Sequence, residues 1–404
     1  MLEFLKNIPL IETDIPALEA LRQKGRCAFA GLPNSKTEAY KYTPVKIALT
    51  PEMFQKAEHT CEKQYCTCGQ DDLPIEGYAF HFCEGVGHTH FHFTDGLEIL
   101  SLTEAIATHE AAKFINKFDL ENFPFAALNT AFLDEGVFLR VSKNLDRPIV
   151  FIYKGKENGF RNIRNLIVIE KGVKAEFIEI FEGSGASYFT NIVSEIFISK
   201  QASLSHYKMQ TEGQNAVHIA LSNVEVKEKG KYESFTFLKG AKLCRNETHV
   251  ILKEEGAEAK VNAAYHLSSV RHSDITTNIE HLSAATKSNQ VIRGVIEDEA
   301  HGVFQGKIHI APDAVKTEGY QIHKALLLSD DAKVDVKPEL EIFADDVKCS
   351  HGATSGDLNK EELFYLTSRG IDEKTAGQIL TSAFLLTAFE DITNPKVKKL
   401  FEAF

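Results

Sequence analysis

The sequence lacks an excess of positive charge, a long apolar run and an N-terminal signal segment, and each absence excludes a class of protein. Its 45 Lys and Arg residues are outnumbered by 57 Asp and Glu, which gives a formal net charge of −12. Nucleic acids and anionic membranes bind basic surfaces, so we expect neither as a partner. The apolar stretch 384–389 is typical of those present and is far too short to span a membrane. With no signal peptide at the N-terminus, the protein is predicted to be cytoplasmic.

Two motifs that carry common chemistries are also missing. The segment 302–308 departs from the phosphate-binding pattern G-x-x-x-x-G-K-[ST] in its spacing and lacks the final hydroxyl, so no nucleotide chemistry is expected of this chain itself. The seven cysteines include no paired CxxC knuckle. In a reducing compartment we expect their thiols to be free, buried or facing a metal rather than joined in disulfides.

Proline is absent between Pro148 and Pro312, and this segment is filled with short alternating apolar and polar runs. Both features indicate many β-strands. A weak repeat runs through the segment, in which a small residue precedes each strand and an aromatic residue or valine follows five positions later. The small residues stand at 172, 202, 230 and 256, and the apolar residues, predicted to point inward, are Phe177, Tyr207, Phe235 and Val261. Small residues at recurring corners favour a stacked β-solenoid, although the repeat is too degenerate to establish it alone.

The two ends of the chain are predicted to be richer in helix. Helix signals cover 14–30, where Pro16 sits in the first turn, and follow the capping box that Ser101 and Glu104 form. Near the other end, Asn359, Asp372 and Asn394 are each placed to begin a helix. We therefore predict an N-terminal mixed, mostly helical domain (1–133), a β core (134–348) and a C-terminal helical domain (349–404).

Cys349 and His351 are the first candidates for metal chemistry. Two residues apart in an extended segment, their side chains leave the same face of a strand. Thiolate and imidazole suit iron, zinc or an iron–sulfur cluster, but two donors cannot complete a tetrahedral site, so a second subunit is the expected source of the others. The alternative is a buried cysteine beside a hydrogen-bonded core histidine. Asp345 and Asp346 are expected to raise the pKa of the thiol.

A second candidate lies in the N-terminal region, where cysteines and histidines cluster. Histidines that alternate along one strand face can bind zinc or nickel. They can equally be the solvent face of an amphipathic strand, and the absence of a paired CxxC favours that interpretation. The residues concerned are Cys61, Cys66, Cys68, Cys83, His81, His88, His90 and His92.

Several motifs in a fixed order resemble one family. Residues 345–354, Asp-Asp-Val-Lys-Cys-Ser-His-Gly-Ala-Thr, followed by Leu-Phe-Tyr-Leu-Thr-Ser-Arg-Gly-Ile at 363–371, are similar to the C-terminal signature of the SufD family, scaffold subunits of the SUF iron–sulfur cluster assembly system. Further segments match that family at the same spacing, and they are 31–33, 41–44, 128–132, 306–308, 326–329 and 338–342.

The resemblance implies a right-handed parallel β-helix over about 134–348 that pairs edge-on with a related SufB-like subunit. Cys349 and His351 match the family's cysteine and histidine at that interface, where a transient iron–sulfur cluster would be held. Helices in 359–404 match the docking site of the SufC-like ATPase, whose motion would open the interface. The resemblance thus implies a non-enzymatic scaffold with no resident cofactor, and the isolated chain could form a homodimer.

Two other functions were considered. A SufB-type paralogue is the nearest alternative, but the motif Cys-Ser-His-Gly-Ala-Thr and the chain length fit the D-type subunit better. A carbohydrate-active enzyme is possible because parallel β-helices host such activities and Asp345 and Asp346 form a carboxylate pair. Adjacent residues on a strand point to opposite faces, however, so these two cannot flank one glycosidic bond.

Overall fold

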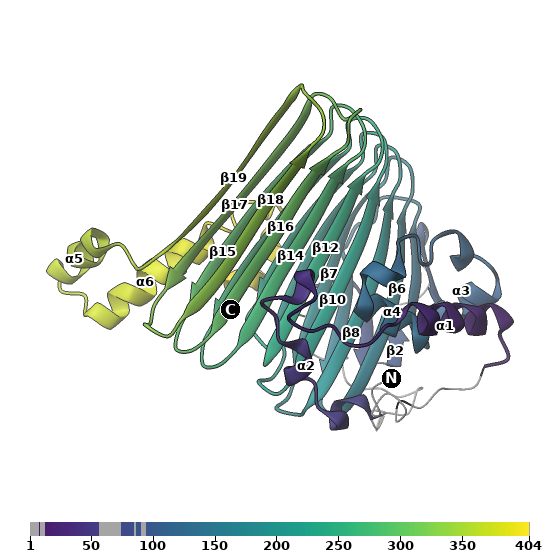
Figure 1. Ribbon diagram of the computed structural model, residues 1–404, viewed down its shortest axis with the longest axis horizontal. Coiled ribbons are helices and arrows are strands. Elements are labelled where there is room, and N and C mark those ends of the chain that lie inside the picture. Colours follow the sequence, from purple (N-terminus) through teal and green to yellow (C-terminus); the bar gives the residue numbers. More distant parts are fainter. Residues whose placement is uncertain (1–7, 9–12, 56–73, 85, 90–93, 404) are drawn as a thin grey trace.

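Two β-sheets dominate the structure (Figure 1). It is a computed structural model, and it describes residues 8, 13–55, 74–84, 86–89 and 94–403. From β4 onward, successive strands alternate between the sheets, and each pairs in parallel with the strand two positions away (Figure 1). This arrangement is the predicted β-solenoid, and the protein is mainly β as expected.

The ten-stranded sheet contains β1 (Tyr78–Cys83), β2 (Val86–Thr89), β5 (Ile149–Gly155), β7 (Lys174–Gly183), β9 (Ser203–Thr211), β11 (Lys231–Leu238), β13 (Glu258–Leu267), β15 (Lys287–Ile296), β17 (Thr317–Leu327) and β19 (Val347–Gly356). The nine-stranded sheet contains β3 (Leu97–Ser101), β4 (Glu135–Val141), β6 (Gly159–Ile169), β8 (Tyr188–Ile198), β10 (Val217–Val226), β12 (Leu243–Leu252), β14 (His272–His281), β16 (His301–Ile310) and β18 (Lys333–Ile342). β1 pairs in parallel with β5 and β3 pairs antiparallel with β4, so the N-terminal region extends both sheets.

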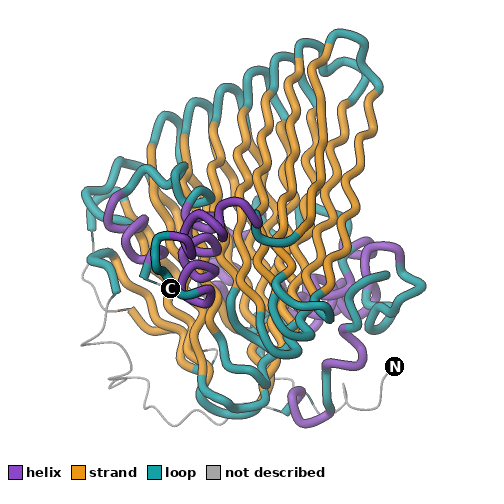
Figure 2. Tube along the Cα trace, turned by 90° about the vertical axis from the view of Figure 1, so that its left-hand side faces the viewer, coloured by secondary structure: helices purple, strands orange, loops and turns teal. Residues whose placement is uncertain are grey.

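The corners that lead from the nine-stranded to the ten-stranded sheet repeat one backbone conformation. Gly172, Gln201, Lys229, Gly256 and Ala285 all have φ between 53° and 75°. A left-handed residue at the same place in each turn lets the chain fold back and start the next strand in register. Figure 2 shows the loops as a stepped row along the stacked strands.

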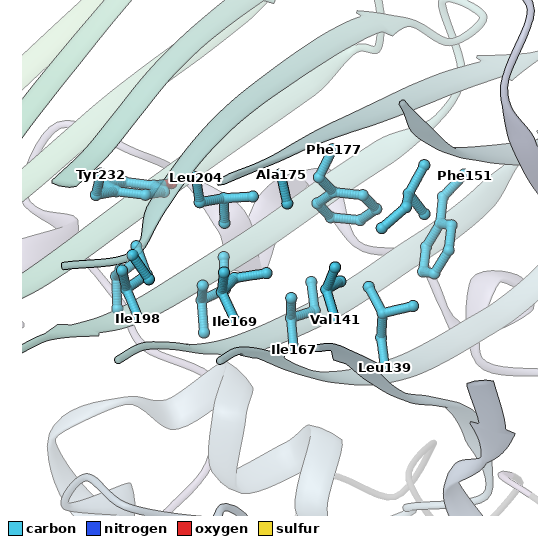
Figure 3. Packing of buried hydrophobic residues seen from close by; sticks show 14 of the residues in the cluster. Leu139, Val141, Phe151, Ile167, Ile169, Ala175, Phe177, Ile198, Leu204 and Tyr232 are labelled. Carbon is cyan, nitrogen blue, oxygen red and sulfur yellow. The ribbon is translucent and has the colours of Figure 1, made fainter. Parts of the chain in front are cut away.

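The interior of the solenoid is filled by side chains stacked in register from turn to turn. Phe82, Tyr153 and Phe181 occupy paired positions on β1, β5 and β7, and successive ring centroids are 4.7 Å and 4.4 Å apart. Figure 3 shows part of the surrounding core, where Phe151 and Phe177 from one sheet face Leu139 and other aliphatic residues from the other. Burying one such side chain contributes roughly 1.5–3 kcal/mol.

The prediction that the four apolar repeat residues all point inward is right for two of them. Phe177 and Val261 belong to the interior core. Tyr207 and Phe235 point to the outer face of the ten-stranded sheet, where the C-terminal helices cover them. The small residues at 202 and 230 follow the left-handed residue, whereas those at 172 and 256 are that residue. The one-residue difference moves the side chain to the other face.

The helical segments lie at the two ends of the chain. They are α1 (Pro16–Ala28), η2 (Glu38–Tyr40), α2 (Val45–Ala48), η3 (Pro51–Phe54), α3 (Leu102–Ala107), η4 (Ala111–Lys113), η5 (Leu120–Asn122), α4 (Pro124–Ala131), α5 (Lys360–Ser368), α6 (Glu373–Leu386) and α7 (Pro395–Glu402). The capping predictions hold for Ser101, Asn359, Asp372 and Asn394, whose side chains accept hydrogen bonds from backbone N–H groups two or three positions further along the chain.

The C-terminal helices divide into a packed part and an exposed part. Leu385, Phe389 and Phe401 pack on Phe235 and its neighbours on the outer face of the ten-stranded sheet. α5 buries no residue and lies beyond the ends of the strands (Figure 1). β19 crosses the predicted domain boundary at 348 and ends at Gly356. The predicted division into three domains stays a prediction.

Candidate interface site at the open end of the solenoid

The last turn of the solenoid is open. β18 and β19 are the outermost strands of their sheets, and within the described residues each is paired on one side only. Cys349 and His351 both lie on β19. They therefore belong to the final strand, and both lie on the extended segment that their spacing predicted.

The pairing of β19 with β17 shows which way the two side chains face. Cys349 is paired with Gly319, and His351 with Gln321. Gly319 and Gln321 are buried, whereas Tyr320 between them is 39% exposed. Paired residues in a parallel ladder share a face of the sheet, so Cys349 and His351 lie on the interior face at the open end.

Cys349 is half-buried among apolar side chains. It packs against the buried cluster that Ile308, Ile310, Ala314 and Ala344 form. Burial raises the pKa of the Cys349 thiol, and a hydrogen bond from the backbone of Gly319 opposes that effect. The direction agrees with the prediction, but desolvation rather than the charge of two aspartates is the cause. The thiol is therefore a weak nucleophile at neutral pH unless a cation or metal approaches it.

Asp345 and Asp346 do not lie on a strand. They occupy the exposed bend between β18 and β19, and the backbone carbonyl of Asp346 accepts a hydrogen bond from the N–H of Lys316 at 2.6 Å. The argument that they point to opposite faces of one strand is therefore wrong. Both carboxylates stand on a convex corner, which gives no support to the carbohydrate-active alternative.

One chain does not supply a complete metal site at this end. His351 is exposed on β19 and can turn toward the interior or toward solvent. Among the described residues there is no group of three or more His, Cys, Asp or Glu side chains that could hold a metal ion. A thiol and an imidazole on an open edge therefore need donors from another molecule, and their role as ligands stays a prediction.

The rim around this edge carries exposed apolar side chains. Ile322, Ile342 and Phe343 are 37%, 41% and 61% exposed. The inward-facing residues of β18, such as Val336 and Leu340, are only partly buried because no further turn covers them. An uncapped edge with an apolar rim is a ready surface for strand pairing with another chain.

The second predicted cluster is mostly outside the described part of the chain. Cys61, Cys66, Cys68, His90 and His92 lie outside the described residues. Cys83 and His81 are buried on β1, and His88 is paired with His81 on the neighbouring β2. The metal hypothesis for this cluster stays untested.

A third surface lies on the exposed helices. Phe364 and Tyr365 on α5 are 72% and 57% exposed, and Ile379 on α6 is 44% exposed. Large apolar side chains that stay in water on a short helix pair mark a candidate contact surface. The sequence predicted docking in this region from resemblance alone.

A polar network that was not predicted from the sequence lies inside the solenoid. Glu179 accepts hydrogen bonds from Tyr153 at 3.0 Å and from His206 Nε2 at 2.8 Å, and Lys208 lies 3.7 Å away. Burial raises the pKa of the Glu179 carboxyl, but Lys208 and His206 outweigh it and hold the pKa below its ordinary value. Burial lowers the pKa of Lys208. The alternation of Leu204, His206 and Lys208 with outward residues was the signal that could have revealed it.

No helix in the described residues combines the length and apolar character needed to cross a bilayer.

Comparison with known proteins gives two family matches. Residues 151–384 match the profile described as "SUF system FeS cluster assembly, SufBD core domain", and residues 4–150 match "SufBD protein N-terminal region".

Individual relatives agree with these matches. The chain is 28% identical to the iron–sulfur cluster assembly protein SufD of Escherichia coli, over 91% of this chain and 87% of that protein. It is 30% identical to an iron–sulfur cluster assembly SufBD family protein of Synechocystis, over 69% of this chain and 65% of the relative. A Staphylococcus aureus SufBD family protein is 27% identical over 65% of this chain and 57% of the relative.

Proposed function

The chain belongs to the SufBD family of the SUF iron–sulfur cluster assembly system, and from this premise we propose that it is a non-enzymatic, cytoplasmic scaffold subunit of the D type. The similarity to a SufD protein over nearly the full chain supports the D type over the B-type paralogue. Cys27, Cys244 and Cys349 are free thiols, which suits a reducing compartment.

The observation that carries the proposal is the uncapped last turn with Cys349 and His351 on its interior face. A related SufB-like subunit that adds its own edge strands to β18 and β19 would satisfy the unpaired backbone groups and cover the apolar rim. In the absence of that subunit, the same edge would pair two copies of this chain.

The nascent iron–sulfur cluster is the cargo of this interface and not a resident cofactor. His351 is the exposed donor and would contribute a ring nitrogen, while the half-buried Cys349 would support it with a thiolate. The raised pKa of Cys349 means that its deprotonation would depend on a metal arriving. The remaining donors would come from the SufB-like subunit.

A SufC-like ATPase would dock on α5 and α6. The exposed Phe364 and Tyr365 supply the apolar contact that this docking needs. α6 leads into the residues that pack on the outer face of the ten-stranded sheet. A movement of α5 and α6 would therefore be transmitted to the solenoid.

The test is anaerobic cluster reconstitution in the complex of this chain with a SufB-like subunit and a SufC-like ATPase. We expect His351→Ala to lower iron and sulfide content at least about tenfold, since even the loss of an outer-shell partner of a metal ligand typically costs that much. Ser350→Ala is the matched control, because Ser350 is exposed on the outer face of the same strand. An unchanged iron and sulfide content in His351→Ala would reject the assignment of this histidine.

A further inference from the structure

A buried glutamine lies one strand behind His351. Gln321 on β17 is the register partner of His351 on β19, and Gln290 on β15 is in turn the partner of Gln321. Gln321 is 3% exposed and Gln290 is fully buried. The three side chains form a polar column on the interior face that ends at the open edge.

The side-chain amide of Gln321 is buried without a hydrogen bond in the described part of the chain. Neither its Oε1 nor its Nε2 has a hydrogen-bond partner among the described residues. Gln290 differs at its Oε1, which accepts a hydrogen bond from Thr277 at 2.6 Å, although its Nε2 has no partner among the described residues either. A buried amide with both polar atoms unpaired is costly and is rarely kept without a partner.

The space around Gln321 is arranged to hold its amide in place. The side chain crosses the interior to Gly306 on β16, where a Cβ atom would overlap Nε2. Gly319, two positions before Gln321, faces Cys349, whose Sγ a Cβ built there would meet at 3.4 Å, an ordinary contact distance. Glycine at 306 thus admits the Gln321 amide near the open end.

We propose that Gln321 is a positioning residue for His351, an inference that rests on the proposed function. Adjacent strands are about 4.8 Å apart, so an inward-turned His351 ring brings one ring N–H within reach of Gln321 Oε1. That hydrogen bond would fix the tautomer and leave the other ring nitrogen as a lone-pair donor toward the partner subunit and the cargo. The amide gains its missing partner when the interface closes over His351.

The first test is a double-mutant cycle in the reconstituted complex, read as iron and sulfide content. Gln321→Leu removes the acceptor at similar volume, and we expect roughly a tenfold loss of iron content. Gln321→Glu keeps an acceptor oxygen and should retain most of the iron. In the His351→Ala background, Gln321→Leu should cause no further loss, because Gln321 acts only through the histidine. Equal losses in both backgrounds would overturn the proposal.

The matched control is Gln290→Leu, which removes a buried amide one turn deeper in the same column. We expect it to lower thermal stability, because Thr277 loses its acceptor, while leaving the iron content unchanged. An equal loss of iron in both variants would show that any change in the polar column lowers the iron content, and it would overturn a specific role for Gln321.

A second measurement does not depend on the cargo or on the leucine variant folding. Ring ¹⁵N shifts of histidine-labelled chain in the metal-free complex report the tautomer of His351, assigned by its absence in His351→Ala. We expect one tautomer in the natural chain and a changed shift in Gln321→Glu or Gln321→Leu. An unchanged shift would overturn the proposal, whereas unchanged iron content in His351→Ala would instead reject the role that the proposed function gives to His351.

Discussion

The guanidinium Nη2 of Arg164 lies 2.6 Å from Oε1 of Glu195, and the two side chains are only 1% and 0% exposed. Glu195 also accepts hydrogen bonds from the backbone N–H groups of Asn116 and Lys117, at 2.8 Å and 2.9 Å. One ion pair on β6 and β8 therefore holds the segment between α3 and α4 against the solenoid. A surface ion pair could not do this, because water would compete for each of these contacts.

Glu195→Ala should lower the free energy of unfolding by about 3–5 kcal/mol, because it leaves the Arg164 charge buried and without its counter-ion. Urea unfolding followed by circular dichroism measures the change. Glu228→Ala is the matched control, since Glu228 pairs with Lys200 at side-chain exposures of 40% and 50% and should cost less than about 1 kcal/mol. Equal costs for the two variants would contradict this account.

The solenoid could be predicted from the sequence, because strands that are hydrogen-bonded on both sides exclude proline and alternate apolar with polar residues. Which face each residue takes could not be predicted as well. Gly172 and Gly256 occupy the left-handed corner, but Gln201 and Lys229 occupy it in the turns between, with the small residue one step later. A repeat counted from the small residues and not from the left-handed corner therefore assigns Tyr207 and Phe235 to the wrong face.

The candidate site was predicted in part for a similar reason. The spacing of Cys349 and His351 predicts a shared face wherever the backbone is extended, and β19 is extended through both. Gln321 could not be related to His351 from the sequence, because their contact depends on the register of β17 and β19. Inter-strand register is a tertiary property that local patterns do not encode.

Stability should fall as the pH falls from 7.5 toward 4. Burial lowers the pKa of His272, His281 and His323 to about 4, below the 6.5 expected when the chain is unfolded. The unfolded state therefore binds protons that the folded state does not between pH 6.5 and pH 4, and each histidine costs about 3 kcal/mol over that range. Urea midpoints measured at pH 7.5, 6.5 and 5.5 test this.

His323→Gln separates one histidine from the rest. Tyr265 Oη and His323 Nε2 are 2.9 Å apart, and a glutamine amide can replace that hydrogen bond without titrating. The variant should lose roughly 1 kcal/mol less than the natural chain between pH 6.5 and pH 5.5, because the unfolded histidine is already half protonated at pH 6.5. Identical pH dependence in the two proteins would show that His323 does not titrate as its burial requires.

Cys349 should react slowly with alkylating agents in the isolated chain. Burial raises the pKa of its thiol, whereas Cys27 is an exposed thiol on α1 and serves as an internal reference. We expect Cys349 to react with iodoacetamide at least about tenfold more slowly than Cys27 at pH 7, since only the thiolate is nucleophilic. Peptide mass spectrometry gives both rates from one sample, and faster labelling of Cys349 would contradict its placement among Ile308 and Leu340.

Phe364→Ala combined with Tyr365→Ala should weaken binding of a SufC-like ATPase more than about tenfold, because exposed aromatic side chains contribute most when a partner buries them. The melting temperature should change little, since both side chains are largely in water and α5 buries no residue. Ile47→Ala is the control, because Ile47 is 83% exposed on α2 near the other end of the chain. Calorimetric titration of the ATPase into each full-length variant measures the affinity. Unaltered affinity in the double variant would place the ATPase on another surface, while a large fall in melting temperature would mean that α5 supports the fold and does not serve only as a contact.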